Sequence, residues 1–71
     1  MSWKVSFHDG SAPQRFSEFM TAKSACIEYL RDWMEPGDVV KRFDDDDATR
    51  FIVYCCGEHT DAMAIVTETS R

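Results

Sequence analysis

Three neighbouring side chains in the C-terminal third of the chain are of types that could do chemistry. Cys55, Cys56 and His59 offer two thiols and an imidazole, the groups that bind zinc or act as a nucleophile and its base. The Cys-x-x-His spacing supplies at most half of a tetrahedral zinc site, and the other histidine, His8, is remote in sequence. We therefore expect no metal, no cofactor and no catalytic residue. If Cys55 faces the core beside Cys26, both thiols are small core fillers.

His8 and Asp9 form a second pair, which could orient an imidazole for base catalysis. Adjacent residues rarely act in this way, and the sequence places no serine or cysteine nucleophile beside them. Gly10 and Pro13 follow, and both residue types favour turns. We interpret His8 and Asp9 as the turn that ends a strand, and we predict that the protein is not an enzyme.

The most distinctive run in the chain consists of Asp44, Asp45, Asp46 and Asp47. Four adjacent carboxylates repel one another strongly enough to need water, a cation or basic side chains nearby. One interpretation is a solvated hairpin turn, whose flanking counter-charges are Lys41, Arg42 and Arg50. A second is an acidic patch that faces a protein partner. The third is a metal site, although the run lacks the alternating ligands, central glycine and distal glutamate of a calcium loop.

The elements that must position these residues include one helix, predicted over residues 22–34. Its apolar residues recur at the spacing of a single helical face, which must be buried: Ala22, Ala25, Cys26, Tyr29, Leu30 and Trp33. Thr21 is the expected N-cap, with Ser24 as the alternative. The segment Glu35-Pro36-Gly37 should end the helix, because proline restricts the preceding residue and glycine accepts left-handed geometry.

Strands account for most of the remaining chain. Trp3, Val5 and Phe7 alternate with polar residues, which predicts a first strand with one buried face. A short second strand is expected over residues 14–20, and β-branched or aromatic runs predict three more at 39–43, 50–56 and 62–67. We therefore predict an α+β fold in the order strand, strand, helix, strand, strand, strand. Its antiparallel sheet has four to five strands, and the helix packs on one face.

The strand over residues 50–56 is apolar on both faces. Phe51, Val53 and Cys55 alternate with Ile52, Tyr54 and Cys56. One helix can cover only one face of a small sheet, so Ile52 and Tyr54 could form an interface. Alternatively, the loop over residues 9–13 shields this face, or Tyr54 and Cys56 are simply tolerated at the surface.

Composition sets the class of protein. A chain of 71 residues forms one small domain over residues 1–71, with a thin core. The net charge of −5 disfavours direct binding to nucleic acid or anionic lipid and favours a partner with a basic surface. We see neither a signal peptide nor a membrane-spanning run, and the three cysteines have no disulfide-framework spacing. We therefore expect reduced thiols, a cytoplasmic location and no membrane association.

The layout described above, with a helix opened by Thr21-Ala22-Lys23-Ser24-Ala25 and an acidic turn at Asp44 to Asp47, resembles the small acidic phage-encoded anti-CRISPR proteins. These inhibitors share no common motif, so the resemblance assigns no functional residue. It implies a protein that binds a CRISPR effector and blocks its nucleic-acid channel, often by offering carboxylates to lysine and arginine.

The sequence therefore predicts a noncatalytic protein-binding inhibitor. Its contact residues would be those of the acidic run together with Ile52 and Tyr54, and its targets would be a CRISPR effector or other nucleic-acid-binding machinery. The alternative is a small homodimeric structural or regulatory module that associates through the second sheet face. A third interpretation, a thiol enzyme or metal protein, rests only on the closeness of Cys55, Cys56 and His59 in the sequence.

Overall fold

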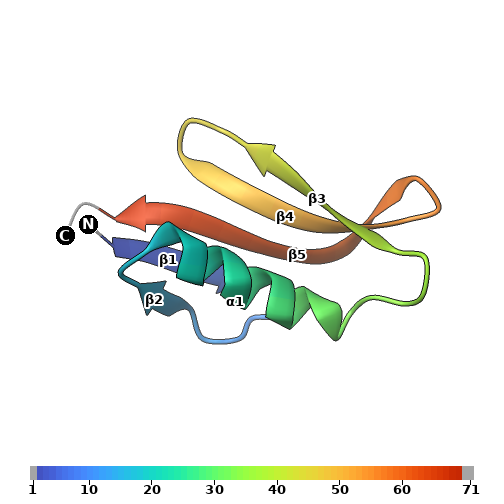
Figure 1. Cartoon of the computed structure of the whole chain (residues 1–71), viewed down its shortest axis with the longest axis horizontal. Coiled ribbons are helices and arrows are strands. Elements are labelled where there is room, and N and C mark those ends of the chain that lie inside the picture. Colours follow the sequence, from blue (N-terminus) through green and yellow to red (C-terminus); the bar gives the residue numbers. More distant parts are fainter. Residues whose placement is uncertain (1, 70–71) are drawn as a thin grey trace.

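The computed structural model describes residues 2–69, in which one helix lies across a five-stranded antiparallel sheet (Figure 1). The elements, in chain order, are β1 (Ser2–Phe7), β2 (Gln14–Phe16), α1 (Phe19–Arg31), β3 (Val39–Asp44), β4 (Ala48–Cys55) and β5 (Glu58–Thr69). The strands lie in the order β2-β1-β5-β4-β3, and every neighbouring pair is antiparallel. The predicted α+β fold is confirmed.

The core lies between α1 and one face of the sheet. The helix contributes three fully buried side chains, Ala22, Cys26 and Leu30. Residues paired across a ladder point to the same face, so the pairs of Val5 with Val66 and of Phe51 with Ala64 supply much of the sheet side. The remaining buried residues of the sheet are Val53 and Ala62.

The helix begins and ends three residues earlier than the sequence pattern predicts. Glu18 has extended backbone and makes no side-chain cap, and its carbonyl accepts the first helical bond from the Ala22 N–H at 3.2 Å. The predicted N-cap Thr21 therefore lies inside α1. At the other end, the Asp32 and Trp33 N–H groups bond to carbonyls three residues back, which tightens and ends the helix before Glu35-Pro36-Gly37.

Trp33 consequently lies beyond the end of α1. The prediction that it is buried together with the other residues of the apolar helical face is wrong. Its side chain is 47% exposed, and its ring packs edge-on against His8 with 4.6 Å between ring centroids. On the same predicted face, Ala25 and Tyr29 are only partly buried. The fully buried stripe of α1 is therefore narrower than predicted.

Among the strands, β2 and β5 differ most from their predicted bounds, whereas the ends of β3 and β4 differ by one or two residues at most. β2 stops at Phe16, because the chain turns into α1 at Phe19. β5 starts at Glu58 instead of residue 62, because Cys56 and Gly57 make a two-residue turn with φ values of 56° and 84°. Two consecutive left-handed residues are typical of a tight hairpin, so residues 58–60 belong to the strand rather than to a connecting loop.

Candidate protein-binding surface

The sheet face opposite α1 has no helix or loop packed over it in the part of the chain that the structure describes; we call it the uncovered face (Figure 1). The ladder pairs Ile52 with Met63 and Tyr54 with Val39, which places all four on this face. Ile52 and Tyr54 are half-buried by their neighbours, whereas Val39 is 50% exposed. The second apolar face that the sequence predicts for the strand over residues 50–56, which is β4, therefore belongs to the uncovered face.

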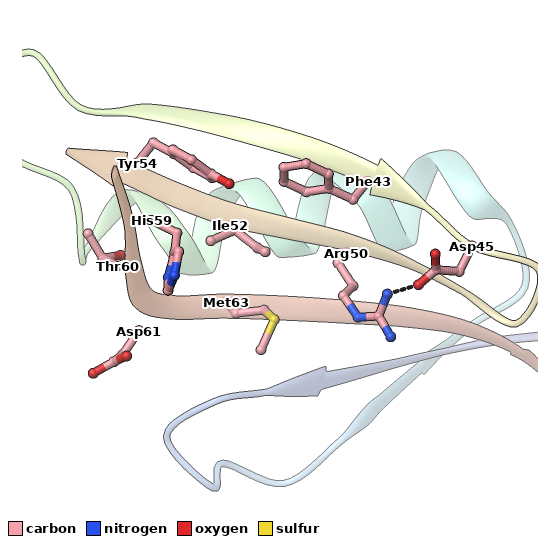
Figure 2. Close-up of a pocket in the computed structure, with 9 residues that line it drawn as sticks. All are labelled: Phe43, Asp45, Arg50, Ile52, Tyr54, His59, Thr60, Asp61 and Met63. Carbon is pink, nitrogen blue, oxygen red and sulfur yellow. Dashed lines mark ion pairs between the residues drawn. The ribbon is translucent and has the colours of Figure 1, made fainter. Parts of the chain in front are cut away.

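A hollow of about 560 Å³ opens on the uncovered face over β3, β4 and β5 (Figure 2). Both apolar side chains and polar or charged side chains line this hollow. Its lining residues are Phe43, Asp45, Arg50, Ile52, Tyr54, His59, Thr60, Asp61 and Met63. Phe43 lies on the edge strand β3, and its side chain is 40% exposed although it is large and aromatic. The hollow thus combines an apolar floor with a charged rim.

An irregularity in β5 shapes one end of the hollow. Ile52 pairs with Met63 but Tyr54 pairs with His59, so β5 carries two extra residues between these points. Thr60 supplies hydrogen bonds where the ladder is interrupted. Its hydroxyl donates to the Val53 carbonyl at 2.8 Å and accepts from the Ala62 N–H at 3.2 Å. Such irregularities bend a strand and redirect its side chains.

Tyr54 is the centre of an aromatic group on this face. Its ring lies 6.1 Å from that of Phe43 and 6.3 Å from that of His59, measured between centroids. The Lys41 ammonium lies 4.5 Å from the Tyr54 ring centroid, in a cation–π contact. Lys41 is exposed, so this cation–π contact lies at the surface of the uncovered face.

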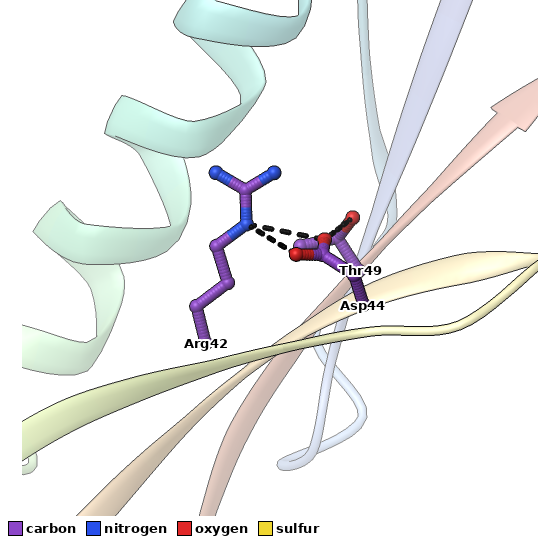
Figure 3. Close-up of polar contacts among 3 residues, drawn as sticks. All are labelled: Arg42, Asp44 and Thr49. Carbon is purple, nitrogen blue, oxygen red and sulfur yellow. Dashed lines mark hydrogen bonds and ion pairs between the residues drawn. The ribbon is translucent and has the colours of Figure 1, made fainter.

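The structure divides the acidic run between the two sides of the sheet. Asp44 lies on the helix-facing side of β3, where its carboxylate accepts hydrogen bonds from Arg42 Nε at 3.1 Å and Thr49 Oγ1 at 2.8 Å (Figure 3). These bonds, the one from Thr49 first, hold the pKa of Asp44 below its ordinary value. Asp44 therefore links β3 to β4 within the hairpin.

Asp45 points to the uncovered face and pairs with Arg50 in the hollow (Figure 2). Asp46 and Asp47 stand exposed at the tip of the turn, and no basic side chain among residues 2–69 pairs with them. Two of the four predicted contact carboxylates thus interact with basic side chains of the chain itself, and the other two form no ion pair within residues 2–69.

Of the predicted contact residues, the structure brings Asp45, Ile52 and Tyr54 together in the hollow and leaves Asp44 on the other side. Sequence reasoning missed Phe43 and Met63. The run over residues 39–43 shows no alternation of apolar and polar residues, so placing Phe43 on the face of Tyr54 and Ile52 required the register between β3 and β4. Met63 required the register between β4 and β5.

His8 and Asp9 do not act on one another through a direct hydrogen bond. Asp9 accepts a hydrogen bond from the Ser11 N–H at 2.9 Å. The Ser11 side chain first, and this backbone bond second, lower the pKa of the Asp9 carboxyl group. His8 Nδ1 lies 3.1 Å from the Tyr29 hydroxyl and 3.3 Å from the Met63 N–H. His8 therefore links the end of β1 to α1 and β5. His8 and Asp9 together form the turn that the sequence predicts at the end of the first strand.

The cysteines fall into two environments. Cys26 is a buried core residue, and burial raises the pKa of its thiol to about 11. Cys55 is exposed at the end of β4, so the condition for a core thiol beside Cys26 is not met. Within residues 2–69 no group of three or more potential metal-ligating side chains is present.

Comparison with protein-family models, curated proteins and solved structures gave no match. None of the helical residues that the structure describes belongs to a segment long and apolar enough to cross a membrane. The uncovered face and its hollow are therefore interpreted from their own chemistry.

Proposed function

We propose that the chain is a noncatalytic inhibitor that binds a protein partner through the uncovered face and the adjacent acidic turn. The hollow carries this proposal, because an open apolar depression with aromatic side chains and a charged rim is typical of protein-binding surfaces. The expected partner has a basic surface, as nucleic-acid-binding proteins do. A CRISPR effector is the target that the resemblance of the sequence suggests.

The proposed mechanism combines long-range attraction with an apolar anchor. Asp46, Asp47 and the net charge of −5 would speed association with a basic surface. Tyr54 and Phe43 would then lose water against the partner and hold it. The bound carboxylates would occupy lysine and arginine side chains that otherwise contact phosphates, which inhibits nucleic-acid binding. The proposal includes a cytoplasmic location, which three free cysteines support.

The test is affinity capture from a bacterial lysate at low and high salt, followed by nucleic-acid binding assays on the captured protein. The native chain should retain a partner at low salt, release most of it at high salt, and reduce the affinity of the partner for nucleic acid. Tyr54→Lys should lose the partner at both salt concentrations. The double variant Asp46→Asn/Asp47→Asn should bind more weakly at low salt and lose most of its salt dependence.

A matched control separates local charge from total charge. The double variant Glu28→Gln/Glu35→Gln changes the formal net charge from −5 to −3, as the aspartate variant does, but alters α1 and the loop after it. It should bind like the native chain. The proposal is wrong if Tyr54→Lys keeps the partner, or if the control loses as much affinity as the aspartate variant.

The second candidate function is the homodimeric module, and the edge position of β3 favours it. This six-residue strand has a free ladder edge and exposes Val39 and Phe43 beside the hollow, so a second copy of the chain could cover them. Light scattering after size exclusion distinguishes the two candidates. A dimer at micromolar concentration that Tyr54→Lys dissociates would support the module, whereas a strict monomer would exclude it.

A further inference from the structure

The turn between β4 and β5 brings two thiols together at the surface. Neighbouring residues of a regular strand point to opposite faces, which would separate the side chains of Cys55 and Cys56. Cys56 instead has a left-handed backbone with φ of 56°, and its Sγ lies 3.7 Å from that of Cys55. Both residues are exposed, whereas Cys26 is buried. The turn therefore presents an accessible pair of adjacent thiols.

The separation of the two sulfur atoms suits a shared ligand. With bonds of about 2.3 Å, as in zinc thiolates, sulfurs 3.7 Å apart subtend about 107° at a bridging centre, close to the tetrahedral angle. A direct disulfide fits less well, because adjacent Cα atoms are only about 3.8 Å apart and disulfides usually need at least about 4.4 Å. The pair is therefore arranged for chelation rather than for oxidation.

We propose that Cys55 and Cys56 form a vicinal dithiol site that chelates a soft, thiophilic centre needing only two protein sulfurs, such as trivalent arsenic. Soft thiolate ligands select soft centres over hard cations. Among residues 2–69 no group of three or more cysteine, histidine or carboxylate side chains is placed to hold one metal ion, which favours a centre satisfied by two sulfurs over structural zinc. The site is independent of the uncovered face and its proposed partner.

The reaction with a trivalent arsenical is balanced without an oxidant. Phenylarsine oxide condenses with the two thiols, so that two arsenic–sulfur bonds form, the arsenic–oxygen bond breaks, and both thiol protons leave in one molecule of water. The neighbouring Cys56 thiol and the Asp38 carboxylate raise the pKa of Cys55 to about 11. Alkylation of Cys55 as a single thiolate should therefore be slow at neutral pH, whereas chelation benefits from the second thiol.

The test uses the full chain, phenylarsine oxide at stoichiometric concentration, and intact-mass and peptide mass spectrometry. We expect one adduct per native chain, mapped to the peptide containing Cys55 and Cys56. Cys55→Ser and Cys56→Asn should each lower the affinity by about 10²–10⁴-fold, because a single thiol lacks the chelate advantage. Asparagine tolerates the left-handed conformation at position 56, so the loss should occur in a folded protein, as checked by circular dichroism.

Two controls identify a bidentate adduct. Cys26→Ala, verified as folded, should keep the full affinity, because Cys26 lies in the core. Excess ethanedithiol should reverse the adduct, while the same concentration of thiol as mercaptoethanol should leave it largely intact. The proposal is overturned if the native chain forms no adduct, if either Cys55→Ser or Cys56→Asn retains native affinity, or if the monothiol reverses the adduct equally well.

Discussion

The carboxylate of Asp44 joins the two strands at the turn end of the β3–β4 hairpin. Its bonds to Thr49 and Arg42 are made by the charged form, which is why the pKa lies below the ordinary value of 3.8. The stability that they supply is fully present above pH 3.8 and is lost as the pH falls through the lower pKa of the folded state.

The predicted outcome is that Asp44→Asn modestly destabilises the protein at neutral pH, and that the difference from the native chain shrinks as the pH falls below 3.8. Urea unfolding across this pH range measures both quantities. Asp46→Asn is the control, because Asp46 has no ion pair among residues 2–69 and should change stability little at neutral pH. A penalty for Asp44→Asn that stays constant down to pH 2 would contradict this assignment.

Backbone conformation at Cys56 and Gly57 predicts opposite effects of two small substitutions. Cys56→Asn should stabilise the protein by up to about 1–2 kcal/mol, because asparagine adopts left-handed geometry more readily than cysteine. Gly57→Ala should destabilise it by a similar amount. A Cβ at Gly57 would meet no atom within 4 Å, so the loss would be conformational rather than steric. Thermal unfolding of both variants tests the turn, and changes of the same sign would refute it.

At the scale of elements, α1 is held by the three residues that it buries. Leu30 is fully buried against the sheet, so Leu30→Ala should cost about 2–5 kcal/mol. A domain of this size has a small stability margin, and the variant should be largely unfolded at 37 °C. Met20 on the same helix is 65% exposed, and Met20→Ala should change stability by less than about 0.5 kcal/mol. Chemical denaturation followed by circular dichroism measures the contrast.

The elements themselves were largely predictable, and their ends were not. Periodicity located α1 because Ala22, Cys26 and Leu30 recur at helical spacing whatever surrounds them. The helix starts at Phe19 without a side-chain cap, so no capping residue marked the boundary. Cys56-Gly57 was missed as a turn because cysteine is an unusual residue for a left-handed position.

The candidate surface was predictable only in part, because the positions of some of its residues depend on how the strands pair. Alternation along β4 identified Ile52 and Tyr54, since it depends only on that strand. The hollow also needs Met63, whose position depends on the register of β5 and its two extra residues near Thr60. The division of the acidic run likewise depends on which way each side chain leaves the turn, so adjacency of Asp44 and Asp45 could not reveal it.

At the scale of the whole molecule, an exposed apolar face is combined with an excess of negative charge. The sequence has a net charge of −5 at neutral pH and a pI near 4.7. As the pH approaches this value, charge repulsion between copies vanishes while the exposed Phe43 and the hollow around Ile52 stay apolar. Association should therefore increase sharply near the pI and proceed through the uncovered face.

This prediction can be tested with two variants of equal charge. Phe43→Lys/Ile52→Lys and Glu28→Gln/Glu35→Gln both change the formal net charge to −3, but only the first places charge on the uncovered face. Light scattering from pH 4 to pH 7 should show strong association of the glutamine variant near its pI and little association of the lysine variant. Each variant is therefore compared at its own pI, because the two have equal formal charge only at neutral pH. Equal association of the two at those pH values would mean that net charge alone controls it, because only the lysine variant alters the uncovered face.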